Sequence, residues 1–83
     1  MVDEKPFSEV VRVAFGESQQ IHDVGSTREA AELLMSTAWP ERGERHRDAT
    51  DTCMKVLEGA RSTIDAERAF TEAAIEAGVL LPE

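Results

Sequence analysis

The sequence is poor in cysteine and lacks long apolar runs. Its 83 residues include a single cysteine, Cys53, so no disulfide can form within the chain. No apolar run approaches the roughly 18 residues that a membrane-spanning helix needs. The first residues, 1–6, are acidic and lack the apolar segment of a secretory signal. These absences predict a cytoplasmic protein that does not enter a membrane.

Basic side chains are also scarce. The chain carries 9 Lys and Arg residues against 17 Asp and Glu residues, which gives a formal net charge of -8. Contacts with phosphate backbones need clustered cations, and a net negative charge repels a polyanion. We therefore expect no general binding to nucleic acid or to anionic lipid.

The sequence contains none of the short motifs of hydrolase, phosphate-binding or zinc-protease chemistry. Cys53 lies on an apolar stripe between Ala49 and Leu57, which predicts a buried thiol rather than a reactive one. His46 and Cys53 are about 10 Å apart along a helix, so they cannot share one metal ion. His22 would need ligands from elsewhere in the chain. We predict no catalytic residue, no cofactor and no metal site, and the small size of the chain also disfavours an enzyme.

Two short β-strands are predicted near the N-terminus. Residues 9–15 alternate in side-chain character and are rich in β-branched residues. Gly16 begins a turn, and a weaker strand follows at 19–24. The pair predicts an antiparallel hairpin, which needs cover because an isolated hairpin is only marginally stable in water.

Three helices should follow the hairpin. Ser26–Glu29 fits a capping box for the first helix, and Pro40 ends it because proline disfavours helical geometry in the preceding residue. Its apolar arc is about 200° wide, so we place this helix between the hairpin and the other helices. A second helix over about 44–58 has a narrow apolar stripe, and a third runs from Ser62 to Gly78. The apolar arc of the first helix consists of Ala30, Ala31, Leu33, Leu34, Met35 and Ala38.

These elements predict an α+β fold in which an antiparallel β-hairpin packs on three α-helices. Residues 1–6 are expected to form a short tail, and residues 7–83 a single compact domain. The short gap between the second and third helices predicts an antiparallel helical hairpin. Residues 79–81 could add a short third strand.

Several segments, in their order and spacing, resemble one protein family. The chain is similar to the bacterial domain of unknown function family 982 over roughly residues 7–80. It departs from that pattern at Glu9–Val10, where the family favours Pro-Val. The resemblance implies a small α+β domain and carries over no catalytic residue. The segments that carry it are Trp39–Gly43, Ala49 with Cys53, Leu57–Gly59, Ala66–Phe70 and Glu76–Gly78.

The one concentration of basic residues lies in segment 41–47, directly after Trp39. One interpretation is a site for an anion or an acidic partner, because arginine side chains bind carboxylates and phosphates through paired donors. The other is a solvated loop whose glutamates neutralise the arginines while Trp39 closes the edge of the core. The residues of this candidate site are Trp39, Arg42, Arg45, His46 and Arg47.

A second candidate surface lies on the last helix, opposite its alanine stripe. Ile64 and Ile75 fall on this outer face, with Arg68 between them. Apolar β-branched residues on an outer face can mark an interface with a partner or a second copy of the chain. Alternatively, Ile64 packs at the loop and residues 79–81 cover Ile75.

We therefore predict a non-enzymatic module that binds a protein partner or itself as a homodimer. The alternative is a regulatory domain that recognises a small anionic ligand through the arginine-rich segment.

Overall fold

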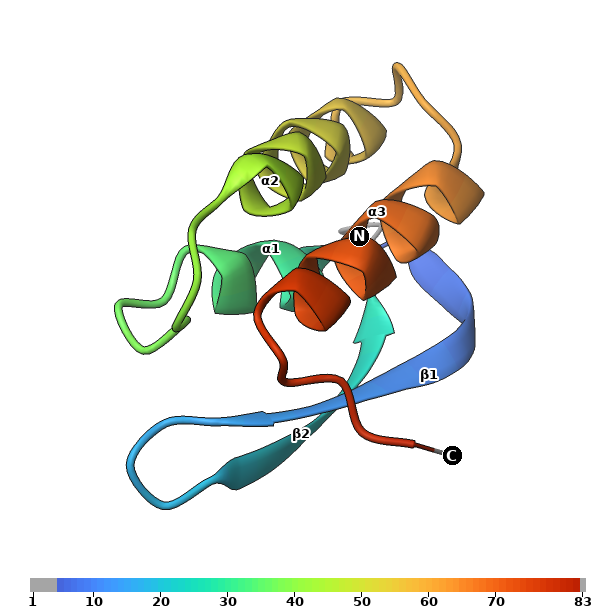
Figure 1. Cartoon of the computed structure of the whole chain (residues 1–83). Coiled ribbons are helices and arrows are strands. Elements are labelled where there is room, and N and C mark those ends of the chain that lie inside the picture. The colour runs from blue at the N-terminus through green and yellow to red at the C-terminus, as the bar shows by residue number, and fades with distance from the viewer. Residues whose placement is uncertain (1–4, 83) are drawn as a thin grey trace.

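A computed structural model describes residues 5–82 of the chain. It confirms the α+β class: a two-stranded antiparallel sheet with three helices (Figure 1). The elements are β1 (Pro6–Phe15), β2 (Gln20–Ser26), α1 (Thr27–Leu34), α2 (Glu44–Leu57) and α3 (Thr63–Glu76).

The hairpin pairs as predicted, with Val11 opposite Val24 and Val13 opposite His22. Because side chains alternate between the two faces of a strand, Val11, Val13 and Phe15 all point into the core, where they are buried together with Val24. β1 begins at Pro6, three residues before the predicted strand, and its register with β2 is interrupted between Pro6 and Val11.

Most of the tail expected at 1–6 lies outside the described residues. Lys5 and Pro6, by contrast, contact the fold. The carbonyl of Lys5 accepts hydrogen bonds from the amide and the hydroxyl of Thr27, both at 2.9 Å. Pro6 pairs with Ser26 at the end of β2.

The helices form two layers over the sheet. α1 and α3 cover the hairpin, and α2 lies beyond them (Figure 1). α1 thus contacts β2 on one side and α2 on the other, as its wide apolar arc indicates. α3 shares this middle position, because it packs on both β1 and α2.

α1 is shorter than predicted, since it ends at Leu34 rather than at Trp39. The hydroxyl of Ser36 accepts a hydrogen bond from the amide of Ala38 at 3.1 Å, a local bond that competes with helix continuation. Met35, expected on the buried arc, is 62% exposed. The early turn carries Trp39 back into the core.

The core centres on Phe70, which has no exposed surface. Its ring centroid lies 5.7 Å from that of Trp39, which in turn lies 5.2 Å from that of Phe15. Aromatic pairs at such distances contribute about 0.5–1.5 kcal/mol each beyond the area they bury. The small residues around them allow α2 and α3 to approach closely: Ala49, Cys53, Ala66, Ala73 and Ala74 are all fully buried.

Gly78 returns the chain to the sheet after α3. Its φ of 69° is a left-handed conformation that glycine adopts without a steric penalty. The amide of Val79 then donates to the carbonyl of Ala74 at 3.0 Å, the bond of a Schellman helix end. The segment 79–81 runs beside β1 with one bridge, Val13 to Leu80. The expected third strand is thus present as a single bridge.

Candidate functional site

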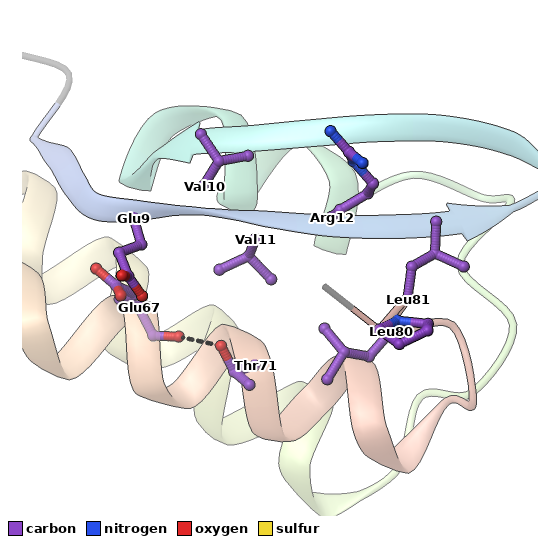
Figure 2. A pocket seen from close by; sticks show the side chains of 9 residues that line it. Glu9, Val10, Val11, Arg12, Glu67, Thr71, Leu80 and Leu81 are labelled. Atoms are coloured by element: carbon purple, nitrogen blue, oxygen red, sulfur yellow. Dashed lines mark hydrogen bonds between the residues drawn. The ribbon is translucent and has the colours of Figure 1, made fainter.

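A groove of about 630 Å³ lies between β1, α3 and the C-terminal segment (Figure 2). We call it the edge groove, because it follows the edge of β1 that faces away from β2. Its lining residues are Glu9, Val10, Val11, Arg12, Glu67, Thr71, Leu80, Leu81 and Pro82.

The backbone edge of β1 is satisfied at both ends of the edge groove. At one end, the amide of Ser8 donates to the carboxylate of Glu67 at 2.8 Å, and the Ser8 hydroxyl donates to the same oxygen at 3.0 Å. At the other end, the carbonyl of Arg12 accepts from the amide of Leu81 at 2.9 Å. The chain itself therefore pairs with this edge on both sides of the groove.

Val10 lies between these two paired positions. The backbone of Arg12 and Ala14 bonds the C-terminal segment, and groups two residues apart point to the same edge of a regular strand, so we infer that the backbone of Val10 faces the edge groove. Among residues 5–82, the backbone bonds between β1 and the C-terminal segment involve Arg12 and Ala14 and stop short of Val10. Val10 also keeps 54% of its surface exposed. Within residues 5–82, the C-terminal segment therefore leaves the middle of this edge uncovered.

The two ends of the edge groove differ in chemistry. Glu9 of β1 and Glu67 of α3 both line one end, so two carboxylates belong to that part of the groove wall (Figure 2). Leu80 and Leu81 make the other end apolar. Arg12, the one cationic lining residue, binds Asp23 of β2 at 2.7 Å, and this hydrogen bond and the charge of Asp23 raise its pKa. The edge groove therefore has an acidic end and an apolar end.

The predicted interface residues lie next to this groove. Ile64 and Ile75 are 62% and 61% exposed, so residues 79–81 leave Ile75 uncovered. Arg68 is exposed between them. Ile64 and Arg68 line a smaller hollow of about 360 Å³, whose wall includes Glu67 and Thr71 of the edge groove. The outer face of α3 and the edge groove thus form one continuous surface.

The predicted basic site is divided between the core and the surface. Trp39 is buried against Phe15 and Phe70, and its indole nitrogen has no hydrogen-bond partner among residues 5–82. His46 is also buried, with Nε2 2.6 Å from the carbonyl of Leu34 at the end of α1. These two rings lie 6.2 Å apart and belong to the interior.

The arginines of that segment point in different directions. Arg42 donates to the carbonyl of Ser36, and Arg45 forms an ion pair of 2.9 Å with Glu72 of α3. Arg47 is exposed on α2. The structure therefore does not bring the three guanidinium groups together around one ligand position.

A carboxylate of the chain also covers the N-terminus of α2. The amides of Arg45 and His46 both donate to Glu76 of α3, each at 3.2 Å. Gly43 makes this approach possible, because a Cβ there would lie 2.8 Å from a Glu76 oxygen. The positive end of the α2 helix dipole, where an anion would bind, thus has an internal partner.

Cys53 lies on the inner face of α2 without exposed surface. Burial raises the pKa of its thiol from 9.0 to about 11. His22 stacks on Phe15 with ring centroids 5.0 Å apart. Within residues 5–82, no three His, Cys, Asp or Glu side chains gather closely enough to hold a metal ion.

The edge groove itself was not predicted. Its signal in the sequence is weak: Val10 is an apolar residue on the outward face of a strand, and the pair Leu80–Leu81 follows a helix-ending glycine. Nothing in that pattern says which edge of the hairpin residues 79–81 would join, or that Glu67 would face Glu9.

Comparisons with other proteins give one result. The family described as a protein of unknown function (DUF982) matches residues 9–81. No curated protein and no solved structure matches the chain. Over residues 5–82, no helix has the length and apolar character to span a membrane. Because the family match covers nearly the whole chain, this protein belongs to the DUF982 family of proteins of unknown function.

Proposed function

We propose that this chain is a non-enzymatic protein-interaction module whose recognition surface is the edge groove together with the outer face of α3. The observation that carries the proposal is the open middle of the β1 edge, which lies beside a groove of about 630 Å³. An unpaired strand edge is a ready template for another polypeptide, and folds that have no use for one normally cover it or block it.

The outer face of α3 supports the same surface. Thr71 follows Ile64 by 7 residues and Ile75 follows it by 11. At 100° per residue, the three side chains lie within about 40° of one another around the helix. The stripe is about 16 Å long and ends in two exposed isoleucines. Large apolar side chains that stay this exposed on one helix face are consistent with a docking surface.

The alternative function, recognition of a small anion by the arginine-rich segment, has less support. An anion there would compete with Glu72 for Arg45 and with Glu76 for the amides of α2. These carboxylates belong to the chain, so their effective concentration is high. We therefore place protein interaction first and anion binding second.

The experiment compares two double variants in affinity purification from the native host, followed by titration of the purified partner. The Ile64→Glu/Ile75→Glu variant should reduce affinity at least about tenfold, because charges on a docking surface are strongly unfavourable. The control is Ile21→Glu/Met35→Glu, whose parent residues are 60% and 62% exposed but lie outside the proposed surface.

The control should change affinity less than about twofold. A dimer that only the first variant dissociates in sedimentation equilibrium would make the partner a second copy of the chain. Equal capture by both variants, or a retained anionic metabolite in place of a protein, would contradict the proposal.

A further inference from the structure

We propose that the edge groove binds one short extended segment of a partner protein, carrying at least one Lys or Arg, as an added strand on β1. This inference rests on the proposed function and specifies the chemistry of the partner. It follows from the backbone edge, from the charge of the groove and from the position of the C-terminal segment.

The chain shows how a strand fits this edge. Residues 79–81 already pair with β1 through the bonds from Ala14 to Val79 and from Leu81 to Arg12, both 2.9 Å. The edge groove continues along the same edge from Arg12 toward Ser8. Ser8 and Arg12, both already paired, are four residue steps or about 13 Å apart, so the stretch between them fits a segment of about three residues. The hydrogen bonds of Val10 would then provide affinity in the manner of strand addition.

The charge of the edge groove selects the partner. Glu67 uses its carboxylate to accept from Ser8, while Glu9 is exposed and forms no hydrogen bond or ion pair within residues 5–82. Arg12 is held by Asp23 on the far side of the strand. An incoming lysine or arginine near Glu9 would therefore have two carboxylates in the groove lining, while the cation of that lining, Arg12, is already bound. The net charge of -8 would add a favourable long-range attraction.

The same features disfavour a second copy of the chain as the occupant. Antiparallel pairing of two β1 strands about Val10 would bring Glu9 and Glu67 of both copies into one interface. These like charges oppose that dimer.

The side chains of the added strand should alternate. Those that point into the groove would contact Thr71 and Leu80, and those on the other face would contact solvent. The hydroxyl of Thr71 already donates to the carbonyl of Glu67 at 2.9 Å, so this part of the wall presents mainly its methyl group. We expect apolar residues at every second position and the cation at the end near Glu9.

The test uses a phage-displayed library of random decapeptides selected on the intact protein. Enriched sequences should alternate apolar residues and contain Lys or Arg. A synthetic peptide of the enriched sequence is then titrated against the wild type, Glu9→Lys and Glu17→Lys. Both variants make the same charge change at an exposed glutamate, but Glu17 lies in the turn after β1, outside the edge groove.

Glu9→Lys should weaken binding at least about tenfold and Glu17→Lys less than about twofold. Hydrogen exchange of the Val10 amide should slow at least about tenfold in the complex, because strand addition gives it an acceptor. A peptide methylated on alternate backbone nitrogens should lose binding.

Several results would overturn the inference. The selection could enrich no sequence, or it could enrich acidic peptides or peptides with helical periodicity. Glu9→Lys and Glu17→Lys could change peptide affinity equally, or hydrogen exchange of the Val10 amide could stay unchanged in the complex. Loss of partner binding in Ile64→Glu/Ile75→Glu together with unchanged Val10 exchange would reject strand addition and leave the interaction function standing. Partner binding that neither variant affects would reject both.

Discussion

The N-terminal corner of α2 and the edge groove both contact α3, yet they use their polar groups in opposite ways. At the corner, the amides of Arg45 and His46 bind Glu76, the side chain of Arg45 binds Glu72, and buried His46 binds the carbonyl of Leu34. At the edge groove, Ser8 and Arg12 are paired, but the backbone of Val10 between them faces an open groove.

This comparison distinguishes charged groups that stabilise the fold from surface that remains accessible to a partner. The corner contains the only basic concentration in the sequence, and its groups are largely satisfied within the chain. The edge groove has no prominent sequence motif, but its lining includes an exposed valine, Val10, and an exposed carboxylate, Glu9, which forms no ion pair within residues 5–82.

The largest effect should come from the residue that supports both regions. Phe70 contacts Trp39 of the corner at 5.7 Å and Phe7 of β1 at 6.5 Å between ring centroids. Phe70→Ala should lower the free energy of unfolding by about 3–5 kcal/mol, since it leaves a cavity at the centre of the core. That is a large part of the roughly 4–12 kcal/mol expected for a chain of this length.

Urea unfolding followed by the fluorescence of Trp39, the single tryptophan, measures this loss. Phe7→Ala is the control, because Phe7 is only partly buried and should lose no more than about 2 kcal/mol. Equal losses in the two variants would mean that the two regions do not depend on one core.

The second prediction tests whether solvent is excluded from the inner face of α2. Burial raises the pKa of Cys53 from 9.0 to about 11, so the unfolded chain releases this proton at a lower pH than the folded chain. The unfolded state therefore binds fewer protons between about pH 9 and pH 11, and stability falls as the pH rises through that window. The loss should reach up to about 2–3 kcal/mol.

Unfolding curves of the wild type and Cys53→Ala across that window isolate the contribution, because the variant lacks the thiol but keeps the other titrating groups. The thiol should also react with a disulfide reagent near neutral pH only as fast as the protein opens. Parallel pH profiles for the two proteins, or rapid reaction of the native thiol, would show that this face is open.

A third prediction concerns the cap of α2. Glu76→Ala removes the acceptor of two helix-terminal amides and should lower stability by about 1–2 kcal/mol. Gly43→Ala should cost a similar amount, because its Cβ would lie 2.8 Å from a Glu76 oxygen and displace the carboxylate. Both changes remove the same interaction, so the double variant should lose no more than the larger single loss. Fully additive losses in urea unfolding would reject this account of the corner.

The smallest predicted effect is the stabilisation by sulfate of the N-terminal corner of α2, measured with and without the Glu76 carboxylate. Sodium sulfate at about 10 mM should stabilise the wild type by less than about 0.3 kcal/mol beyond a sodium chloride control of matched ionic strength. Glu76→Ala exposes the N-terminus of α2 beside Arg45, so it should gain about 0.3–1 kcal/mol. Stabilisation of the wild type by more than 1 kcal/mol, lost in Arg45→Ala, would favour the anion-binding function.

Much of the fold follows from local patterns. The alternation along β1 and the helix-ending glycines confirm the predictions, and both Ser26 and Ser62 act as N-caps. In the predicted capping box, the Ser26 hydroxyl accepts from the amide of Glu29, and the Glu29 carboxylate accepts from that hydroxyl. The end of α1 was placed too late, because proline at position 40 is a visible stop signal while the competing hydroxyl of Ser36 is not. The buried state of Cys53 followed from the apolar stripe around it.

The binding surfaces were only partly predictable. The exposure of Ile64 and Ile75 followed from their position opposite the alanine stripe of α3. The pairing of Arg45 with Glu72 and of Glu76 with α2 joins residues about 30 positions apart, so no local pattern contains it. The edge groove depends likewise on Glu67 and Leu81 reaching β1 from the far end of the chain.

The sequence by itself determined the helices, the hairpin, the inward faces and the excess of negative charge, because each depends on neighbours within a few residues or on composition. Only the tertiary structure decided which charges neutralise one another and which stretch of β1 stays unpaired. Those outcomes depend on contacts between segments that are distant in sequence, and their geometry is set by the packing of the whole core around Phe70 and Trp39.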